Sequence, residues 1–381
     1  MPQLNLLQKS TVWLLAFSVM LFSSMANAQS SKQYKQVIIG YIGGYHGLID
    51  TTLVDANKIT ILNYAFVNVL GNRAVLTNIK SDTVNFKYLL KLKKVNPDLK
   101  IVISIGGWGW SKNFSDAVLS DTSRAAFVAS AIKIVRKYHL DGIDIDWEYP
   151  GMVGAGNIHR DTDKQNYTLM FQGLRKGLDS VETETGKKLL LTAAVGISKG
   201  FLLHTEMGKV ASYLNYVNLM TYDFSYGDTL AIHHTNLYAS KSYSSNQNGA
   251  AAVTDFEAAG VPAGKLVMGI AFYGHTSKVI PNDQHGLGIK TIGGRIFTPG
   301  GYTYIKDSLV NHNGFKYYRD KDAKAPYLYN EALQQFISFD DEWSVSEKCK
   351  YVRKNDMAGV MFWEYAGDKK NYLLDEIDKD L

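Results

Sequence analysis

Eight short runs of apolar and β-branched residues recur along the chain, and they constrain its fold more than any other feature. Near-continuous apolar runs are typical of strands covered on both faces, as in a parallel sheet. Patterns typical of amphipathic helices lie between most of the runs, so strands and helices alternate. The runs are Val37–Tyr41, Ile59–Val67, Ile101–Ile105, Gly142–Trp147, Leu189–Val195, Tyr216–Thr221, Leu266–Ala271 and Gly359–Trp363.

The expected helices carry apolar residues at intervals of three and four. Eight strands alternating with helices predict an α/β fold, the (β/α)8 or TIM barrel. The alternative is an open doubly wound sheet, which is disfavoured because no G-x-G-x-x-G motif opens a helix after the first strand. The candidate helices are residues 82–95, 121–135, 165–181, 249–260 and 344–354.

One connection is too long for a simple loop. The seventh and eighth runs are far apart, and a structureless loop of that length is improbable in a compact domain. We therefore expect a small α+β insertion at residues 274–332, which divides the barrel into residues 29–273 and 333–381. Its aromatic residues form either the core of the insertion or a sugar-binding wall: Tyr302, Tyr304, Phe315, Tyr317, Tyr318, Tyr327 and Tyr329.

Residues 1–28 are typical of a secretory signal peptide. Lys9 precedes the apolar run Val12–Phe22, which is too short to span a bilayer, and Ala26–Ala28 forms an A-x-A cleavage site. We expect cleavage before Gln29 and a secreted protein, either extracellular or periplasmic, without a membrane anchor. The alternative is an uncleaved N-terminal anchor.

Composition excludes several other classes of protein. The single cysteine, Cys349, rules out a disulfide framework and a cysteine-rich metal site. The net charge of +5 is spread along the chain, so no nucleic-acid partner is expected. Aromatic residues make up 12% of the chain, and such rings can stack on sugars as well as pack cores. We expect a monomer without cofactor or metal.

The fourth run carries an acidic face. Asp144, Asp146 and Glu148 alternate with three apolar residues, and alternate side chains of a strand share a face. Burying carboxylates within a sheet is costly unless they are paired, protonated or in use. Neighbouring like charges should raise at least one pKa, and a carboxyl with a raised pKa can act as a general acid. The alternatives are a solvated edge strand and a Ca²⁺ or Mg²⁺ site.

Four motifs together resemble glycoside hydrolase family 18, the chitinase family. The D-x-x-D-x-D-x-E signature is complete from Asp141 to Glu148, and the companion motif is Ser104 to Trp108. Met220 to Asp223 forms the Met-Thr-Tyr-Asp motif, and Trp363 matches the tryptophan of the closing strand. The motifs occur on the third, fourth, sixth and eighth runs, in the order of the family.

The resemblance implies hydrolysis of β-1,4 linkages in chitin or chitooligosaccharides, with retention through an oxazolinium ion formed by the substrate's own acetamido group. It assigns Glu148 as general acid and base, and Asp146 as the carboxylate that stabilises the acetamido nitrogen. Asp144 matches the buried partner of Asp146, with which it should titrate as a coupled pair. Tyr222 matches the residue that holds the acetamido oxygen.

The resemblance also implies a set of substrate-binding residues. Trp363 matches the apolar floor beneath the distorted sugar, whereas Asp141 is expected to be structural. The remaining matches are Asp223, Met220, Trp108, Tyr41, Phe66 and Tyr273, with Trp110 as a possible extension of a subsite.

The chain departs from the family at His275, where many relatives have arginine in a Tyr-Gly-Arg motif. We interpret His46, His233, His234 and His275 as structural or surface residues. No function is assigned to Glu364 and Tyr365. Two other functions remain open: an endo-β-N-acetylglucosaminidase acting on N-glycans, and a sugar-binding protein without activity. The latter is disfavoured because Glu148 is present.

Overall fold

The computed structural model describes residues 36–224 and 229–381. Eight parallel strands form a closed barrel, because β1 pairs with both β14 and β2. The predicted TIM barrel is therefore confirmed, and each predicted run contributes one strand. The strands are β1 (Val37–Gly43), β2 (Ile61–Leu70), β4 (Lys100–Gly106), β5 (Gly142–Asp146), β6 (Leu190–Val195), β7 (Tyr216–Leu219), β8 (Leu266–Ala271) and β14 (Gly359–Trp363). A short strand, β3 (Arg73–Val75), extends β2 as an antiparallel partner.

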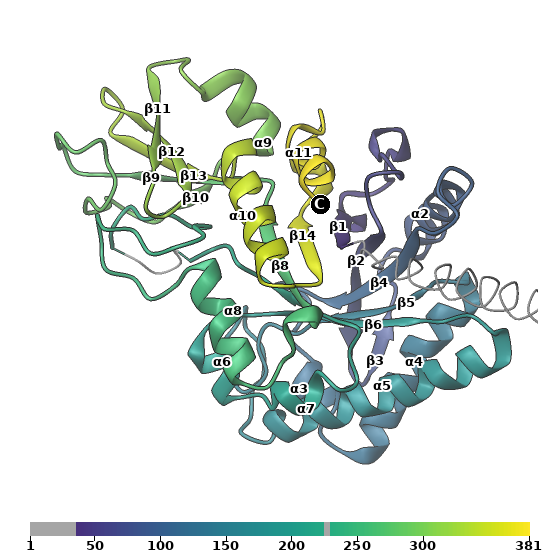
Figure 1. Ribbon diagram of the computed structural model, residues 1–381. Coiled ribbons are helices and arrows are strands. Elements are labelled where there is room, and N and C mark those ends of the chain that lie inside the picture. Colours follow the sequence, from purple (N-terminus) through teal and green to yellow (C-terminus); the bar gives the residue numbers. More distant parts are fainter. Residues whose placement is uncertain (1–35, 225–228) are drawn as a thin grey trace, which may run out of the picture. The chain divides into compact units, whose positions relative to one another are not determined.

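Helices follow most of these strands and lie outside the sheet (Figure 1). Side-chain caps set several of their starts: Asn78 accepts a hydrogen bond from the Ser81 N–H, which starts α2 three residues before the predicted Asp82. Ser120 and Asp341 form capping boxes at α4 and α10. The helices are α2 (Ile79–Leu92), α3 (Phe114–Ala117), α4 (Asp121–Tyr138), α5 (Asp163–Thr185), α6 (Lys199–Leu203), α7 (Met207–Val210), α8 (Gly249–Ala258), α10 (Glu342–Lys354) and α11 (Tyr372–Asp380).

The acidic strand separates two environments. Ile143, Ile145 and Trp147 belong to the core between strands and helices, where the Trp147 ring stacks on Phe114 at 5.1 Å. The carboxylates of the same strand face the barrel interior instead. This is the alternation that the sequence pattern predicts for β5.

A second, antiparallel sheet lies between β8 and β14 in the sequence, with the strand order β10-β9-β13-β12-β11 (Figure 1, upper left). It continues past residue 332, because β13 pairs with both β9 and β12. Its elements are β9 (Gly274–Lys278), β10 (Ile296–Phe297), α9 (Gly301–Tyr304), a π-helical turn (Ile305–Leu309), β11 (Phe315–Asp320), β12 (Ala325–Asn330) and β13 (Gln335–Phe339).

A buried ion pair joins this sheet to the barrel. Lys348 on α10 donates to Asp340 at 2.6 Å, and both side chains are almost fully buried. The same carboxylate accepts hydrogen bonds from Thr235 and from the Ala271 N–H at the end of β8. Because removing one partner would leave a buried charge uncompensated, the pair fixes the return of the chain into the barrel.

The predicted signal peptide, residues 1–28, lies outside the described residues. Among the residues that the structure describes, no helix is long and apolar enough to cross a membrane.

Candidate active site

A cavity of about 660 Å³ opens at the carboxyl ends of the barrel strands. Residues at or just beyond the ends of all eight strands line it, which is where TIM barrels carry their chemistry. Asp144 and Tyr41 do not line it. The predicted site residues that do line it are Asp146, Glu148, Met220, Tyr222, Asp223, Trp108, Phe66, Tyr273 and Trp363.

Asp144 lies below the cavity floor and is fully buried. Its carboxylate accepts hydrogen bonds from Ser104 at 2.7 Å and Thr192 at 2.5 Å. Tyr41 donates a further bond at 3.0 Å, so this tyrosine supports the floor from beneath rather than lining the cavity. Burial raises the pKa of Asp144, and these donors offset part of that effect.

Asp146 lies two residues further along β5, on the same face as Asp144, and is nearly buried. Among the described residues its Oδ1 atom has no hydrogen-bond partner. Burial raises the pKa of Asp146 well above its usual value, and the negative charges of Glu148 and Asp144 raise it further. A carboxyl group in this setting binds a proton, or a positive charge beside it, more tightly than one in water.

Glu148 follows the strand and faces the cavity, with its own N–H bonded to Ser111 Oγ at 2.9 Å. Burial raises the pKa of Glu148 to about 7, while a hydrogen bond from Tyr149 lowers it and the charge of Asp223 raises it. Like-charge repulsion, which the sequence analysis invoked, is thus the smaller cause. A carboxyl group with this pKa can give and take a proton near neutral pH.

Two glycines at the end of β4 let the chain approach β5 and the Phe66 ring of β2 closely. Both have positive φ, 113° at Gly106 and 87° at Gly107. A Cβ atom on Gly106 would lie 2.1 Å from the Asp146 carbonyl oxygen, and one on Gly107 would strike the Phe66 ring at 2.6 Å. The glycines of the Ser104–Trp108 motif therefore maintain the spacing behind the carboxylates.

Aromatic rings form the floor and one side of the cavity. The Trp363 ring stacks on Phe66, with centroids 5.3 Å apart and planes 22° apart. Trp108 is 45% exposed and lies near Tyr149, at 6.4 Å. A sugar ring has apolar faces made of axial C–H groups and polar edges made of hydroxyl groups. Flat aromatic rings suit the faces, and carboxylates suit the edges.

Tyr222 lies after β7, and its hydroxyl contacts the Met361 sulfur at 3.7 Å. Burial raises the pKa of Tyr222 well above 10, and the charges of Asp146 and Asp223 act in the same direction. The hydroxyl therefore keeps its proton at neutral pH and serves as a hydrogen-bond donor in the cavity.

Asp223 is surrounded by donors. Its Oδ1 accepts from Tyr273 at 2.9 Å and from His275 at 2.6 Å, and Arg295 Nη2 lies 3.7 Å away. Burial alone would raise the pKa of Asp223, but the nearby His234 and the hydrogen bond from His275 outweigh it and hold the pKa below its usual range. Asp223 therefore stays ionised in the same cavity that favours protonation of Glu148.

The departure at position 275 now has a structural explanation. His275 is buried and bound to Asp223, and Arg295, in the segment just before β10, lies against the same carboxylate and lines the cavity. No sequence motif marks Arg295. His234 and His275, expected to be structural or surface residues, contact Asp223 at the cavity.

Asp223, His234 and His275 are also close enough to hold a metal ion, with ligand atoms within 4.8 Å of one another. Tyr273 and Arg295 already contact the carboxylate oxygen that would face such an ion. A guanidinium so close to the site disfavours a second cation. We therefore interpret the group as a hydrogen-bonded network.

Other lining residues that the sequence analysis did not identify include Tyr45, Tyr149 and Phe297. Tyr149 directly follows the acidic strand, so its position was a usable signal. Tyr45 lies in the turn after β1 and Phe297 lies in β10, and neither belongs to a motif.

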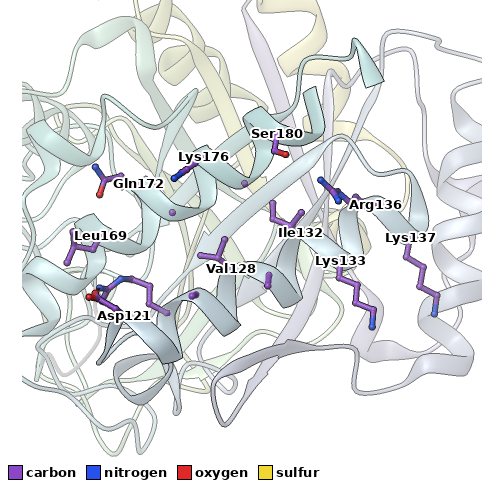
Figure 2. A pocket seen from close by; sticks show the side chains of 15 residues that line it. Asp121, Val128, Ile132, Lys133, Arg136, Lys137, Leu169, Gln172, Lys176 and Ser180 are labelled. Atoms are coloured by element: carbon purple, nitrogen blue, oxygen red, sulfur yellow. The ribbon is translucent and has the colours of Figure 1, made fainter. Parts of the chain in front are cut away.

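A larger depression, about 1230 Å³, lies between α4 and α5 (Figure 2). Small and apolar side chains such as Val128 and Ile132 line its base, and the lysines Lys133 and Lys137 extend from α4. Among its lining residues the only carboxylate is Asp121, which pairs with Arg124. Because its lining has no pair of carboxylates, this depression lacks the acid and base groups of the cavity at the strand ends.

Comparison with known proteins agrees with this geometry. Residues 37–368 match the model of glycosyl hydrolases family 18. Chitinase A1 of Niallia circulans is 33% identical over 93% of this chain, which spans 60% of that protein's length. Mouse chitotriosidase-1 is 33% identical over 81% of this chain and 67% of its own. The solved structure of a family 18 N-acetylglucosaminidase from Paenibacillus barengoltzii has a TM-score of 0.85 and 39% identity, covering 91% of this chain and all of that one.

Proposed function

Because the chain belongs to glycoside hydrolase family 18, we propose that it hydrolyses β-1,4 linkages between N-acetylglucosamine units of chitin or chitooligosaccharides. The observation that carries the proposal is Glu148, a cavity-facing carboxyl with a pKa of about 7, which lies beside buried Asp146. This pair provides an acid for the leaving group and a negative charge for the intermediate.

In the proposed reaction Glu148 donates its proton to the glycosidic oxygen while the 2-acetamido oxygen of the sugar attacks C1. The C1–O bond breaks, the leaving sugar departs, and an oxazolinium ion remains. Glu148, now ionised, takes a proton from water as the water adds to C1. The acetamido group is released, and two displacements at C1 retain its configuration.

Asp146 and Tyr222 act on the acetamido group. The carboxylate of Asp146 stabilises the positive charge that develops at the acetamido nitrogen, and it requires no rearrangement because β5 already holds it. Tyr222 donates its hydroxyl to the acetamido oxygen and fixes it for attack on C1. Asp144, buried beneath Asp146, adds a negative charge that raises the pKa of Asp146.

The proposal is tested with a fluorogenic N-acetylglucosamine oligomer and a thiazoline analogue of the oxazolinium ion. We expect hydrolysis, competitive inhibition by the thiazoline, and β-configured first product by proton NMR. An α-configured first product, or no inhibition by the thiazoline, would contradict the route through the acetamido group.

The solved Paenibacillus relative is described as an N-acetylglucosaminidase, so release of single N-acetylglucosamine units is the second candidate activity. Measuring the length of the first product distinguishes it from release of longer oligomers. Release of N-glycans from a glycoprotein, without cleavage of chitin oligomers, would instead indicate an endo-β-N-acetylglucosaminidase.

We further propose that the protein is secreted after removal of residues 1–28. The A-x-A sequence at Ala26–Ala28 supports this. Amino-terminal sequencing of the protein from its native host should begin at Gln29, and a retained Met1 would contradict cleavage.

A further inference from the structure

A group of three residues lies beside the cavity, and one of them, Tyr45, lines it. Tyr45 and His46 form a 3-10 turn (Gly44–His46) after β1, and Glu364 directly follows Trp363. The Tyr45 hydroxyl donates to Glu364 Oε1 at 3.0 Å, and His46 Nε2 lies 3.0 Å from the same oxygen. The Glu364 side chain is only 15% exposed, so this carboxylate is a buried anchor for both rings.

This group lies across the barrel mouth from the proposed acid. Glu148 follows β5 and Glu364 follows β14, and the strand order places β5 and β14 four strands apart in either direction around the barrel. In an eight-stranded barrel such strands are diametrically opposed. The cavity therefore runs from Glu148, past Trp363, towards Tyr45.

That direction fixes the orientation of a bound sugar, given the proposed function. The sugar above Trp363 has its C1 atom at Glu148, where the glycosidic bond breaks. Carbons 1 and 4 occupy opposite ends of a pyranose ring, so the 4-hydroxyl of this sugar points towards Tyr45. In a β-1,4 polymer any further sugar on the non-reducing side would have to continue through the position of Tyr45.

No pyranose ring fits between Tyr45 and the aromatic rings that flank it. The Tyr45 and Trp363 centroids are 6.5 Å apart with planes 15° apart, and Tyr45 and Phe66 are 6.2 Å apart. Trp110 packs against Tyr45 at 5.7 Å. A pyranose ring in van der Waals contact with two flanking rings needs about 7–8 Å between them.

We propose that Tyr45, positioned by Glu364 and His46, is the end wall of the cavity, and that the sugar above Trp363 is the non-reducing terminal unit of the substrate. The enzyme then releases single N-acetylglucosamine units from that end. This inference rests on the proposed function and defines its mode of action: Tyr45 determines product length, and Glu364 acts through Tyr45 as a positioning residue.

The test uses the wild-type protein and chitotetraose labelled with a fluorophore at its reducing end. The expected first products are unlabelled N-acetylglucosamine and labelled trimer. Disaccharide or unlabelled trimer as the first product would overturn the inference. Nitrophenol should be released faster from the nitrophenyl glycoside of N-acetylglucosamine than from that of its dimer, and the reverse order would also overturn it.

Variants test the wall itself. Tyr45→Ala should raise the ratio of disaccharide to monosaccharide among first products at least tenfold, and Glu364→Ala should raise it less. The control is Tyr304→Ala, which removes a tyrosine of similar exposure, 43% against 42%, outside the cavity. An unchanged product ratio in Tyr45→Ala would overturn the role of Tyr45.

The two proposals fail in different ways. Absence of cleavage of every N-acetylglucosamine oligomer by the wild-type protein would overturn the proposed function, and this inference with it. Cleavage with retention but with disaccharide as first product would leave the proposed function intact and overturn the end wall alone. The wild-type product analysis decides the mode even where a variant does not fold.

Discussion

Two walls of one cavity shift the pKa of a carboxyl group in opposite directions. On the β5 wall the pKa values of Asp146 and Glu148 are raised, whereas after β7, two strands away around the barrel, the pKa of Asp223 is lowered. Desolvation raises the pKa of all three, and the outcome differs because their surroundings differ. The Asp223 side chain is 39% exposed and accepts hydrogen bonds from Tyr273 and His275. Asp146 is nearly buried, faces other carboxylates and has an oxygen without a partner among the described residues. The donors around each carboxyl group decide its charge.

The largest expected effect comes from removing the acid on the β5 wall. Glu148→Gln keeps the shape of the side chain and removes its proton transfer, so kcat should fall by about 10²–10⁴. Steady-state kinetics with a fluorogenic oligomer measures this. Glu331→Gln, at an exposed turn, is the control and should retain wild-type kcat. Equal rates for Glu148→Gln and wild type would refute the assignment.

Asp146→Asn should lower kcat by about 10²–10³, because a neutral amide cannot stabilise the positive charge of the intermediate. Binding of the uncharged substrate should change less than kcat. A variant with reduced affinity for oligomers but unchanged kcat would show that Asp146 only binds substrate. The kcat and KM values, measured separately, distinguish the two cases.

The pH dependence of wild-type kcat/KM follows from the protonation of Glu148. The acid must carry its proton, and its pKa is about 7, so activity should be present below that pH and fall as the pH rises through it. A profile of kcat/KM from pH 5 to 9 measures the pKa in the free enzyme. Activity that already falls steeply at pH 5 would contradict the raised pKa, and activity that stays constant up to pH 9 would contradict a pKa of about 7.

The smallest expected effect is a shift of the pH profile when the charge of Asp223, on one wall, no longer acts on Glu148, on the other. The charge of Asp223 raises the pKa of Glu148, so Asp223→Asn should move the alkaline limb to lower pH, by up to about one unit. His275→Gln leaves the aspartate in place and serves as the comparison, with a smaller displacement expected. A displacement to higher pH in Asp223→Asn would show that the two walls are not coupled in this way.

The barrel and its acidic strand were predictable because both depend on local periodicity. Strands buried on both faces leave continuous apolar runs, and Asp144, Asp146 and Glu148 share a face whatever the rest of the chain does. The contacts of Tyr45 and Arg295 were not predictable. Their partners, Glu364 and Asp223, are distant in sequence and lie on irregular connections, where no period fixes side-chain direction.

Tyr41 shows a further limit. Its match to a lining position of the family predicts a residue at the cavity, but the structure places its ring beneath the floor, bonded to Asp144. Two residues along a barrel strand, on the same face, separate a supporting position such as Asp144 from a lining position such as Asp146. The sequence motif identifies the strand end and its chemistry. Only the packing of neighbouring strands decides how deep in the barrel each side chain lies.

The second sheet leaves and rejoins the barrel at almost the same point, since Gly274 on β9 is paired with Phe339 on β13. Paired residues of antiparallel strands are about 5 Å apart, a gap that a tight turn can bridge. A short turn could therefore connect the two ends of the segment. Arg295 and Phe297 belong to this segment and line the cavity. Replacing the segment would therefore change both the depth of the cavity and the charge beside Asp223.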